Sequence, residues 1–263
     1  MTTIISQIGD HLEYFLLLLL RISGLLMASP IFGRKNVPNT AKVGLCLVLT
    51  YVVFSTNLNA AFITTDNLAQ YVLLCVKELL FGVVIGYVTT MFFTLVQTAG
   101  YVIDMQMGFG MVNVFDVQSN ISVPLTGNLL YIMLIIAFFA VDGHLRLIYI
   151  LMATVTSVPI GQVTINPQIA LVALEVFALS FVLAINVAMP MVVSGLFGEV
   201  FMGFIVRTTP QMNVFVVGIP LKIAMGFLVL LLMIPVYVSF TNTIFDNMFS
   251  MIDTMFKGLA GAA

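Results

Sequence analysis

The stretch IAMGFLVLLLMIPVYVSFTNTIF, residues 223–245, contains no charged side chain and decides the class of fold. A run of about 20 predominantly apolar residues in an α-helix is long enough to cross the hydrocarbon core of a bilayer. Five other windows are equally free of charge: 43–65, 79–103, 117–141, 147–174 and 176–198. A soluble domain has no use for so much uninterrupted apolar chain, so most of the surface must face lipid or other apolar protein.

The overall composition leads to the same class. Hydrophobic residues make up 61% of the chain and charged residues 8%, whereas about 25% of the residues in a soluble domain are charged. A transmembrane β-barrel would alternate apolar and polar residues, and these runs do not. The net charge of −2 gives no reason to expect nucleic acid as a partner. The sequence therefore predicts an all-α, polytopic membrane protein.

In the first third of the chain we predict three helices: Tyr14–Phe32, 43–65, and a long helix from Leu68 to about Val102. The third is longer than one membrane crossing, so part of it must leave the bilayer, tilt or be covered by protein. Arg21 lies inside the first apolar run, where a cation needs a partner or a wet cavity. On the long helix, the pair Gly82 and Gly86 permits close approach of a neighbouring helix.

Segment 104–126 interrupts the helical pattern. It contains Gly108, Gly110 and Pro124 together with methionine and phenylalanine, and it is too rich in glycine to be a helix. A soluble loop would be polar, so an apolar loop must be buried or line something. We expect helix to resume near Gly127 and to end at the turn Asp142-Gly143-His144.

The last third predicts a helical hairpin. One arm runs from about Pro167 to Val206 with a kink at Pro190, and the turn lies around 207–210. The return arm begins after Pro220 and ends near Phe245. An amphipathic tail, 246–259, is expected to lie at a membrane interface.

No catalytic, cofactor or metal site is predicted, so the chain is not expected to be an enzyme. His11 and His144 are the two histidines, no Cys or His pair has metal-ligand spacing, and there is no phosphate-binding glycine loop. The charges inside apolar stretches either pair to fix helix and subunit packing or form an ion pathway. These charges are Arg21, Lys77, Glu78, Glu175 and Glu199.

Five blocks of the sequence carry a resemblance that covers nearly the whole chain. They are RISG at 21–24, SPIFG at 29–33, KE at 77–78, GYVIDMQMGFGMVNVFD at 100–116 and PQMNVFVVGIPLKI at 210–223. Together they resemble the FliR family, the export-gate subunits of the flagellar type III secretion apparatus, which has counterparts in virulence injectisomes.

The resemblance implies an assembly. Members of this family join FliP and FliQ subunits in a helical hetero-oligomer that encloses the pore for unfolded flagellar proteins, with FlhB and FlhA as further partners. By this resemblance, residues 1–166 are FliP-like and residues 167–263 form a FliQ-like hairpin with its tail. The expected location is the bacterial inner membrane in the flagellar basal body, raised toward the periplasm.

The resemblance also implies that the loop after the third helix helps to plug the pore. Methionine and phenylalanine suit a dry, compliant seal, and glycine gives a loop freedom to move aside. The alternative is that the loop packs between neighbouring subunits as a wedge. The predicted plug residues are Met105, Met107, Gly108, Phe109, Gly110, Met111, Val112, Asn113 and Phe115.

A second set of residues is predicted to contact other subunits. The hairpin turn offers two cations and two amide side chains, and the other members are charges in apolar stretches. The set is Arg21, Lys77, Glu78, Glu175, Arg207, Gln211, Asn213 and Lys222.

Two other functions fit the composition. A secondary transporter for a small solute would use Glu175, Arg21 and the broken helix at 104–126, although no inverted repeat is visible. A structural scaffold would differ from a gate subunit only in lacking a moving plug.

Overall fold

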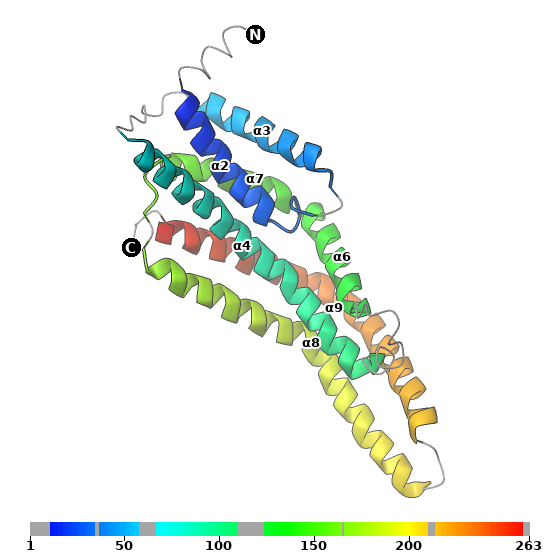
Figure 1. Ribbon diagram of the computed structural model, residues 1–263. Helices are drawn as coiled ribbons and strands as arrows, with labels where there is room; N and C mark the ends of the chain where they lie inside the picture. The colour runs from blue at the N-terminus through cyan, green and yellow to red at the C-terminus, as the bar shows by residue number, and fades with distance from the viewer. Residues whose placement is uncertain are drawn as a thin grey trace. The chain divides into compact units, whose positions relative to one another are not determined.

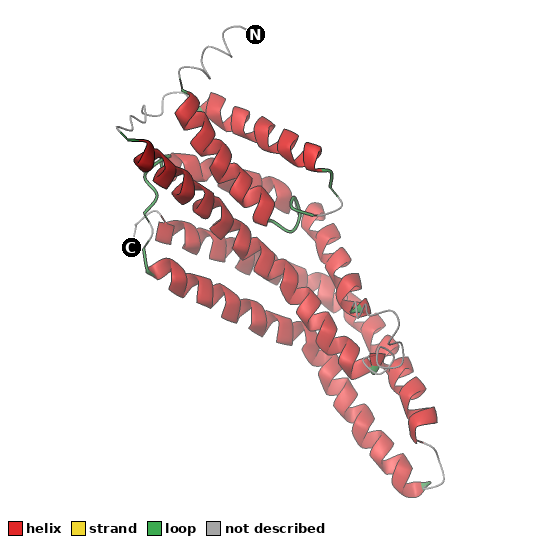
Figure 2. Ribbon diagram, viewed as in Figure 1, coloured by secondary structure: helices red, strands yellow, loops and turns green. Residues whose placement is uncertain are grey.

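The computed structural model describes residues 11–34, 37–57, 67–109, 124–164, 166–209 and 214–259. Within these ranges the regular structure is helical throughout, with short connections between the helices (Figure 2). The prediction of an all-α protein is therefore confirmed. The helices are α2 Leu12–Ala28, α3 Asn39–Thr56, α4 Leu68–Met107, α6 Leu125–Ala140, α7 Gly143–Ser157, α8 Gln168–Thr208 and α9 Val214–Leu259.

Fewer helices than the six charge-free windows can span a membrane. In the described residues, α3, α4, α8 and α9 are long and apolar enough, and α6 with α7 form a pair bent by 65° that counts as one more span. Windows 117–141 and 147–174 suggested two separate crossings, but α6 has 16 residues and α7 has 15. The predicted turn after α6 is present, and Asp142 there adopts a left-handed φ of 54°.

Three helices are longer than one crossing. α4 has 40 residues, α8 has 41 and α9 has 46, against about 20 needed for the hydrocarbon core. The long third helix was predicted, but it continues past Val102 to Met107. The long first arm of the hairpin is also present, with Pro190 inside α8.

The return arm differs from the prediction at both ends. α9 begins at Val214 and contains both Pro220 and Pro235, because proline is tolerated in membrane helices where neighbours satisfy the freed backbone groups. The tail is the last part of the same helix and not a separate surface helix. Its apolar side chains, including Met248, Ile252 and Met255, are buried inside the chain.

The chain divides into two compact units. Unit 1 comprises Met1–Met91, Asp142–Phe177 and Asn247–Ala263, and unit 2 comprises Phe92–Val141 and Ala178–Asp246. α4, α8 and α9 contribute residues to both units. The predicted boundary at residue 166 concerns internal resemblance, which is a different property, and it stays a prediction.

In unit 1, α7 lies beside α2 and α4 (Figure 1), and α2 approaches α4 closely at glycines. A Cβ atom on Gly82 would lie 2.1 Å from the backbone oxygen of Arg21, and one on Gly24 would lie 2.6 Å from that of Leu79. A Cβ on Gly86 would lie 2.4 Å from the Cβ of Ala28. The predicted close approach at Gly82 and Gly86 is confirmed, and it places Arg21 against α4.

In unit 2, an aromatic cluster joins α4, α6 and α9. The ring of Phe138 meets Phe93 at 5.4 Å and Phe245 at 5.5 Å between centroids. The hydroxyl of Tyr237 donates to the backbone oxygen of Leu130 at 2.9 Å. These contacts fix α6 against the second half of α4 and the return arm.

Candidate functional site

The two ends of the predicted plug segment meet at a buried carboxylate in unit 2. Asp104, on the last turns of α4, is 7% exposed. Its two oxygens accept from the backbone N–H of Thr126 at 3.2 and 3.3 Å, and one also accepts from the Thr126 hydroxyl. Pro124, at the N-cap of α6, offers no side-chain acceptor. Asp104 therefore supplies the negative charge and the acceptor that the first turn of α6 needs.

One turn away, α4 and α6 touch backbone to backbone. A Cβ on Gly100 would lie 2.0 Å from the Cα of Gly127, so α4 has no room for a side chain here, and a Cβ on Gly127 would lie 3.1 Å from the backbone oxygen of Gln97. We call Gly100, Asp104, Thr126 and Gly127 the neck. Because of the neck, the chain enters and leaves segment 108–123 at one place.

Gly108 ends α4. Its φ is +87°, and its N–H donates to the backbone oxygen of Met105 at 3.2 Å. This is the left-handed conformation that glycine adopts just after a helix C-terminus. The prediction that Gly108 breaks the helical pattern is therefore explained by a helix cap.

The last turn of α4 lies between the two arms of the hairpin in unit 2. A Cβ on Gly195 of α8 would lie 2.8 Å from the amide oxygen of Gln106, and one on Gly226 of α9 would lie 2.6 Å from the Cγ of Met107. The ring of Phe109 stacks edge-on against Phe227 with 5.9 Å between centroids. Glycines on α8 and α9 thus leave space for Gln106 and Met107. We call residues 106–109 the base of the segment.

The predicted plug residues divide into two groups. Met105 is 55% exposed, whereas Met107 is 1% exposed against the hairpin. Because α4 extends to Met107, that side chain belongs to the base in this structure and not to a free loop. Gly108 and Phe109 follow at the end of the helix. The remaining predicted plug residues lie outside the described residues: Gly110, Met111, Val112, Asn113 and Phe115.

An ion pair joins the two arms of the hairpin near this base. The Nζ of Lys222 on α9 lies 2.7 Å from Oε1 of Glu199 on α8, with side chains 29% and 54% exposed. An exposed pair of this kind contributes at most about 1 kcal/mol, so it sets register more than stability. The two residues lie at equal sequence separations on either side of 210–211, a signal in the hairpin pattern that would have predicted the pairing.

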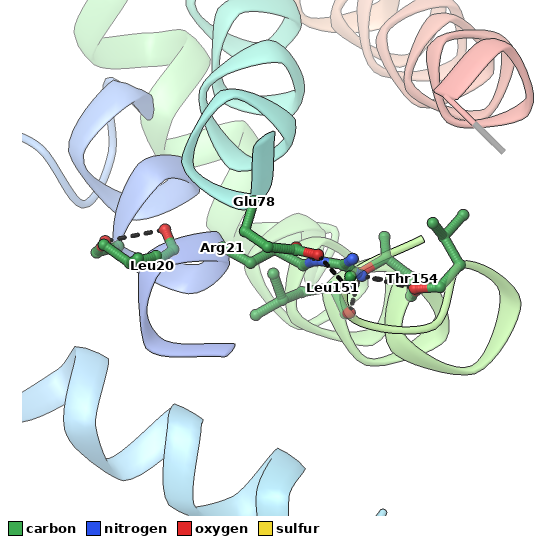
Figure 3. Close-up of polar contacts among 8 residues, drawn as sticks. Leu20, Arg21, Glu78, Leu151 and Thr154 are labelled. Carbon is green, nitrogen blue, oxygen red and sulfur yellow. Dashed lines mark hydrogen bonds and ion pairs between the residues drawn. The ribbon is translucent and has the colours of Figure 1, made fainter. Parts of the chain in front are cut away.

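Unit 1 contains a second, fully buried ion pair. The Nε of Arg21 lies 2.6 Å from Oε2 of Glu78, and both side chains are 0% exposed. Arg21 Nη1 also donates to the backbone oxygens of Thr154 at 3.2 Å and Val158 at 2.9 Å. Figure 3 shows the Arg21 side chain extending from α2 past Glu78 of α4 toward Thr154 of α7. Glu78 in turn accepts from the N–H of Gly161 at 2.7 Å.

This pair joins two members of the predicted subunit-contact set. Arg21 and Glu78 pair inside one chain with side chains that are 0% exposed, and their contact with another subunit stays a prediction. Further hydrogen bonds from backbone groups stabilise buried ions, and here they reach Arg21 Nη1 and Glu78, whereas Arg21 Nη2 is buried without a hydrogen-bond partner. The same burial makes Arg21 inaccessible to a small solute, which counts against the transporter alternative.

The other members of the predicted contact set are at the surface or undescribed. Glu175 and Arg207 are exposed, and Lys77 is half-buried. Gln211 and Asn213 lie outside the described residues. No group of three His, Cys, Asp or Glu residues able to hold a metal ion occurs in the described part of the chain.

Comparison with known proteins gives one consistent result. The chain matches the family described as bacterial export proteins, family 1, over residues 12–248. It is 34% identical to the flagellar biosynthetic protein FliR of Bacillus subtilis over 97% of this chain and 98% of that protein. It is 27% identical to the FliR of Escherichia coli over 89% of each chain. Yop proteins translocation protein T of Yersinia pestis is 26% identical, over 83% of this chain and 84% of that protein.

Proposed function

Because the chain belongs to the bacterial export proteins of family 1, the family of the FliR proteins, we propose that it is a subunit of the flagellar type III protein export gate. As a member of this family it is an integral membrane component of an export apparatus. In the proposal it forms, with FliP and FliQ, the closed pore through which unfolded flagellar proteins cross the inner membrane. FlhB and FlhA are the further partners, and the assembly is raised toward the periplasm.

The observation that carries this proposal is the length of exposed apolar surface along α8. Large apolar side chains are exposed from Leu171 to Val206, which is about 50 Å along a helix at 1.5 Å per residue. One membrane crossing takes about 20 residues of helix, and up to about 25 when the helix is tilted, which is fewer than the 36 residues from Leu171 to Val206. Other apolar protein is the remaining cover for the excess.

The contact surface includes both arms of the hairpin. Phe197 and Phe204 of α8 and Leu231 and Leu232 of α9 are all well exposed. Large apolar side chains exposed together on a protein surface mark sites of protein or membrane contact. A subunit embedded in a ring of sister proteins needs such surfaces along its whole length.

The proposal also assigns a role to segment 104–126. The neck fixes where the segment starts and ends, and the segment contains apolar residues with glycine, which suit a compliant seal. We propose that it blocks ions and small solutes until an unfolded substrate enters the pore. The contrasting role is a static wedge between neighbours.

Co-purification tests the assembly. An affinity-tagged copy of this chain, extracted in mild detergent from cells that express the neighbouring export proteins, is expected to bring FliP and FliQ with it. A chain that is extracted alone, as a stable monomer or homodimer, contradicts the proposal.

Deletion of Gly108–Met111 tests the plug. We expect the deleted variant to assemble with the same partners and to make cells permeable to small solutes, as measured by dye or ion leakage. Assembly with unchanged tightness contradicts the plug and favours the wedge.

A further inference from the structure

We infer that Arg21 and Glu78 are positioning residues that hold both roots of the hairpin in unit 1. The roots are the first turns of α8, residues 168–177, and the last turns of α9, residues 247–259. The inference rests on the proposed function, because roots held in one place matter for a hairpin whose arms must dock against neighbouring subunits.

The first root is fixed through the connection that leads into α8. Arg21 holds the backbone oxygen of Val158, and three residues later Glu78 holds the N–H of Gly161. Gly161 has a φ of +88°, so the chain turns sharply at this point. The connecting side chains Ile160 and Val163 are buried. The two members of the ion pair therefore bind the two ends of one turn: Arg21 binds Val158, and Glu78 binds Gly161.

The hydrogen bond from Arg21 to the backbone oxygen of Val158 also caps the C-terminus of α7. Val158 is the C-cap residue, and Thr154 lies in the last turn, so both of their backbone oxygens lie at the negative end of the helix. A guanidinium group there satisfies the carbonyl of Val158, gives the carbonyl of Thr154 a second donor beside the N–H of Val158, and interacts favourably with the helix dipole. The planar fork of arginine reaches the carboxylate and the carbonyls at once, which a lysine cannot do.

The second root is fixed through Phe81, one turn after Glu78 on α4. The Arg21 guanidinium lies 4.3 Å from the centroid of the Phe81 ring. That ring, fully buried, stacks edge-on against Phe256 of α9 at 6.3 Å. The Thr164 hydroxyl also donates to the backbone oxygen of Leu259 at 3.3 Å, which joins the connection to the end of α9.

Both roots thus depend on one buried pair, and the contacts that connect them lie within unit 1. The arms beyond the roots, 178–208 and 214–246, pack in unit 2 on other residues. Loss of the ion pair should therefore loosen the packing of the two roots in unit 1, while buried side chains in unit 2 stay inaccessible to solvent. A residue that only contributed to general stability would loosen both units alike.

Cysteine protection measures this difference in the full chain in membranes. Cys46 and Cys75 are first replaced by alanine, and single cysteines are placed at Val176 in the α8 root, at Met255 in the α9 root and at Leu134 in unit 2, all buried. In Arg21→Lys and Glu78→Gln, we expect maleimide labelling at 176 and 255 to rise about tenfold or more. Labelling at 134 should not change.

Glu13→Gln is the matched control, because it removes an exposed carboxylate on α2 without touching the pair. It is expected to leave all three rates unchanged. An equal rise at all three positions in Arg21→Lys, or no rise at either root, overturns the inference.

A photoreactive residue at Phe197 on the exposed face of α8 separates this inference from the proposed function. In the wild-type chain we expect it to attach to a neighbouring export protein, and in Arg21→Lys we expect that adduct to fall about tenfold at equal chain amount. If the wild-type chain gives no protein adduct, the proposed function fails, while the labelling rates still decide the role of the pair. If the wild-type chain gives the adduct and Arg21→Lys keeps it, the inference fails alone.

Discussion

At the scale of single residues, the packing of α2 against α4 depends on glycines, because a larger residue at these positions would keep the two helices apart. Gly24, Gly82 and Gly86 bring α2 and α4 into backbone contact. Close backbone approach lets membrane helices associate through van der Waals contact, since lipid gives them no hydrophobic drive to pair. The same approach brings the charge on α2 to the charge on α4.

Gly82→Ala tests this contact. The added methyl group would lie 2.1 Å from the backbone oxygen of Arg21, so the helices must separate, and we expect a loss of about 1–3 kcal/mol in stability. Gly203→Ala is the control, since no atom lies within 4 Å of a Cβ there, and it should stabilise α8 slightly. Resistance to heating of each purified variant in detergent measures both. Equal effects at the two glycines would contradict the packing described.

Arg21→Leu tests the buried pair. Removal of one partner leaves Glu78 as an uncompensated buried charge, which costs about 3–5 kcal/mol. We therefore expect little full-length chain in membranes. The double variant Arg21→Leu/Glu78→Leu should recover much of it, because it buries no lone charge, as measured by chain abundance and protease resistance. A double variant less abundant than the single one would contradict this.

At the scale of helices and connections, the sequence predicted which elements occur better than where they end. The hairpin, the long third helix and the break after it follow from apolar runs and from glycine and proline. Gly108 is a local signal for the end of α4, but the continuation of the helix past Val102 is not predictable locally, because its last turn occupies space left by Gly195 and Gly226 on helices far away in the sequence. Tertiary contacts of this kind override local propensity.

For the candidate site, the sequence indicated single residues but not the partners that they contact. Arg21 was recognised as a charge in need of a partner, but Glu78 could not be chosen from the available acids by spacing alone. Asp104 marked the start of the break, yet its contact with Thr126 follows from how α4 and α6 cross at Gly100 and Gly127. The separate turn before α7 was visible, since Asp142-Gly143 is a local signal.

The neck makes a prediction at this scale. Asp104→Ala removes the only side-chain acceptor described for the first turn of α6, and Thr126→Val removes the hydroxyl donor. Hydrogen bonds to a charged group contribute about 1.5–3 kcal/mol, so both variants should let the segment shift and make cells leak small solutes. Thr126→Ser should stay tight. Asp253→Ala, at an exposed position of α9, controls for the lost charge.

The ion pair between Glu199 and Lys222, which joins the two arms of the hairpin, leads to another prediction. Glu199→Lys and Lys222→Glu each place like charges opposite each other, so we expect each to reduce motility. The double exchange restores an opposite pair and should recover it, as spreading in soft agar measures. Failure of the double exchange to improve on either single variant would show that the pair does not set the register.

At the scale of the whole molecule, exposed apolar side chains continue along α8 for longer than one membrane crossing takes. Its mean composition and its charge-free windows predicted membrane insertion, and in the described residues four helices, or five spans with the bent pair, are long and apolar enough for it. Two of the windows fold into the bent pair α6 and α7, and three others extend into helices of 40 residues or more. Hydropathy reports burial in an apolar medium, and it does not distinguish lipid from a neighbouring subunit.

The most direct test of that claim is to identify what covers α8 in the cell. A photoreactive amino acid is placed singly at exposed positions along the helix, Leu171, Phe181, Phe197 and Phe204, and at buried Val187 as a control. We predict adducts with other proteins of the export apparatus at several exposed positions and none at 187. Adducts with lipid alone at all four exposed positions, from an intact and stable chain, would contradict the account.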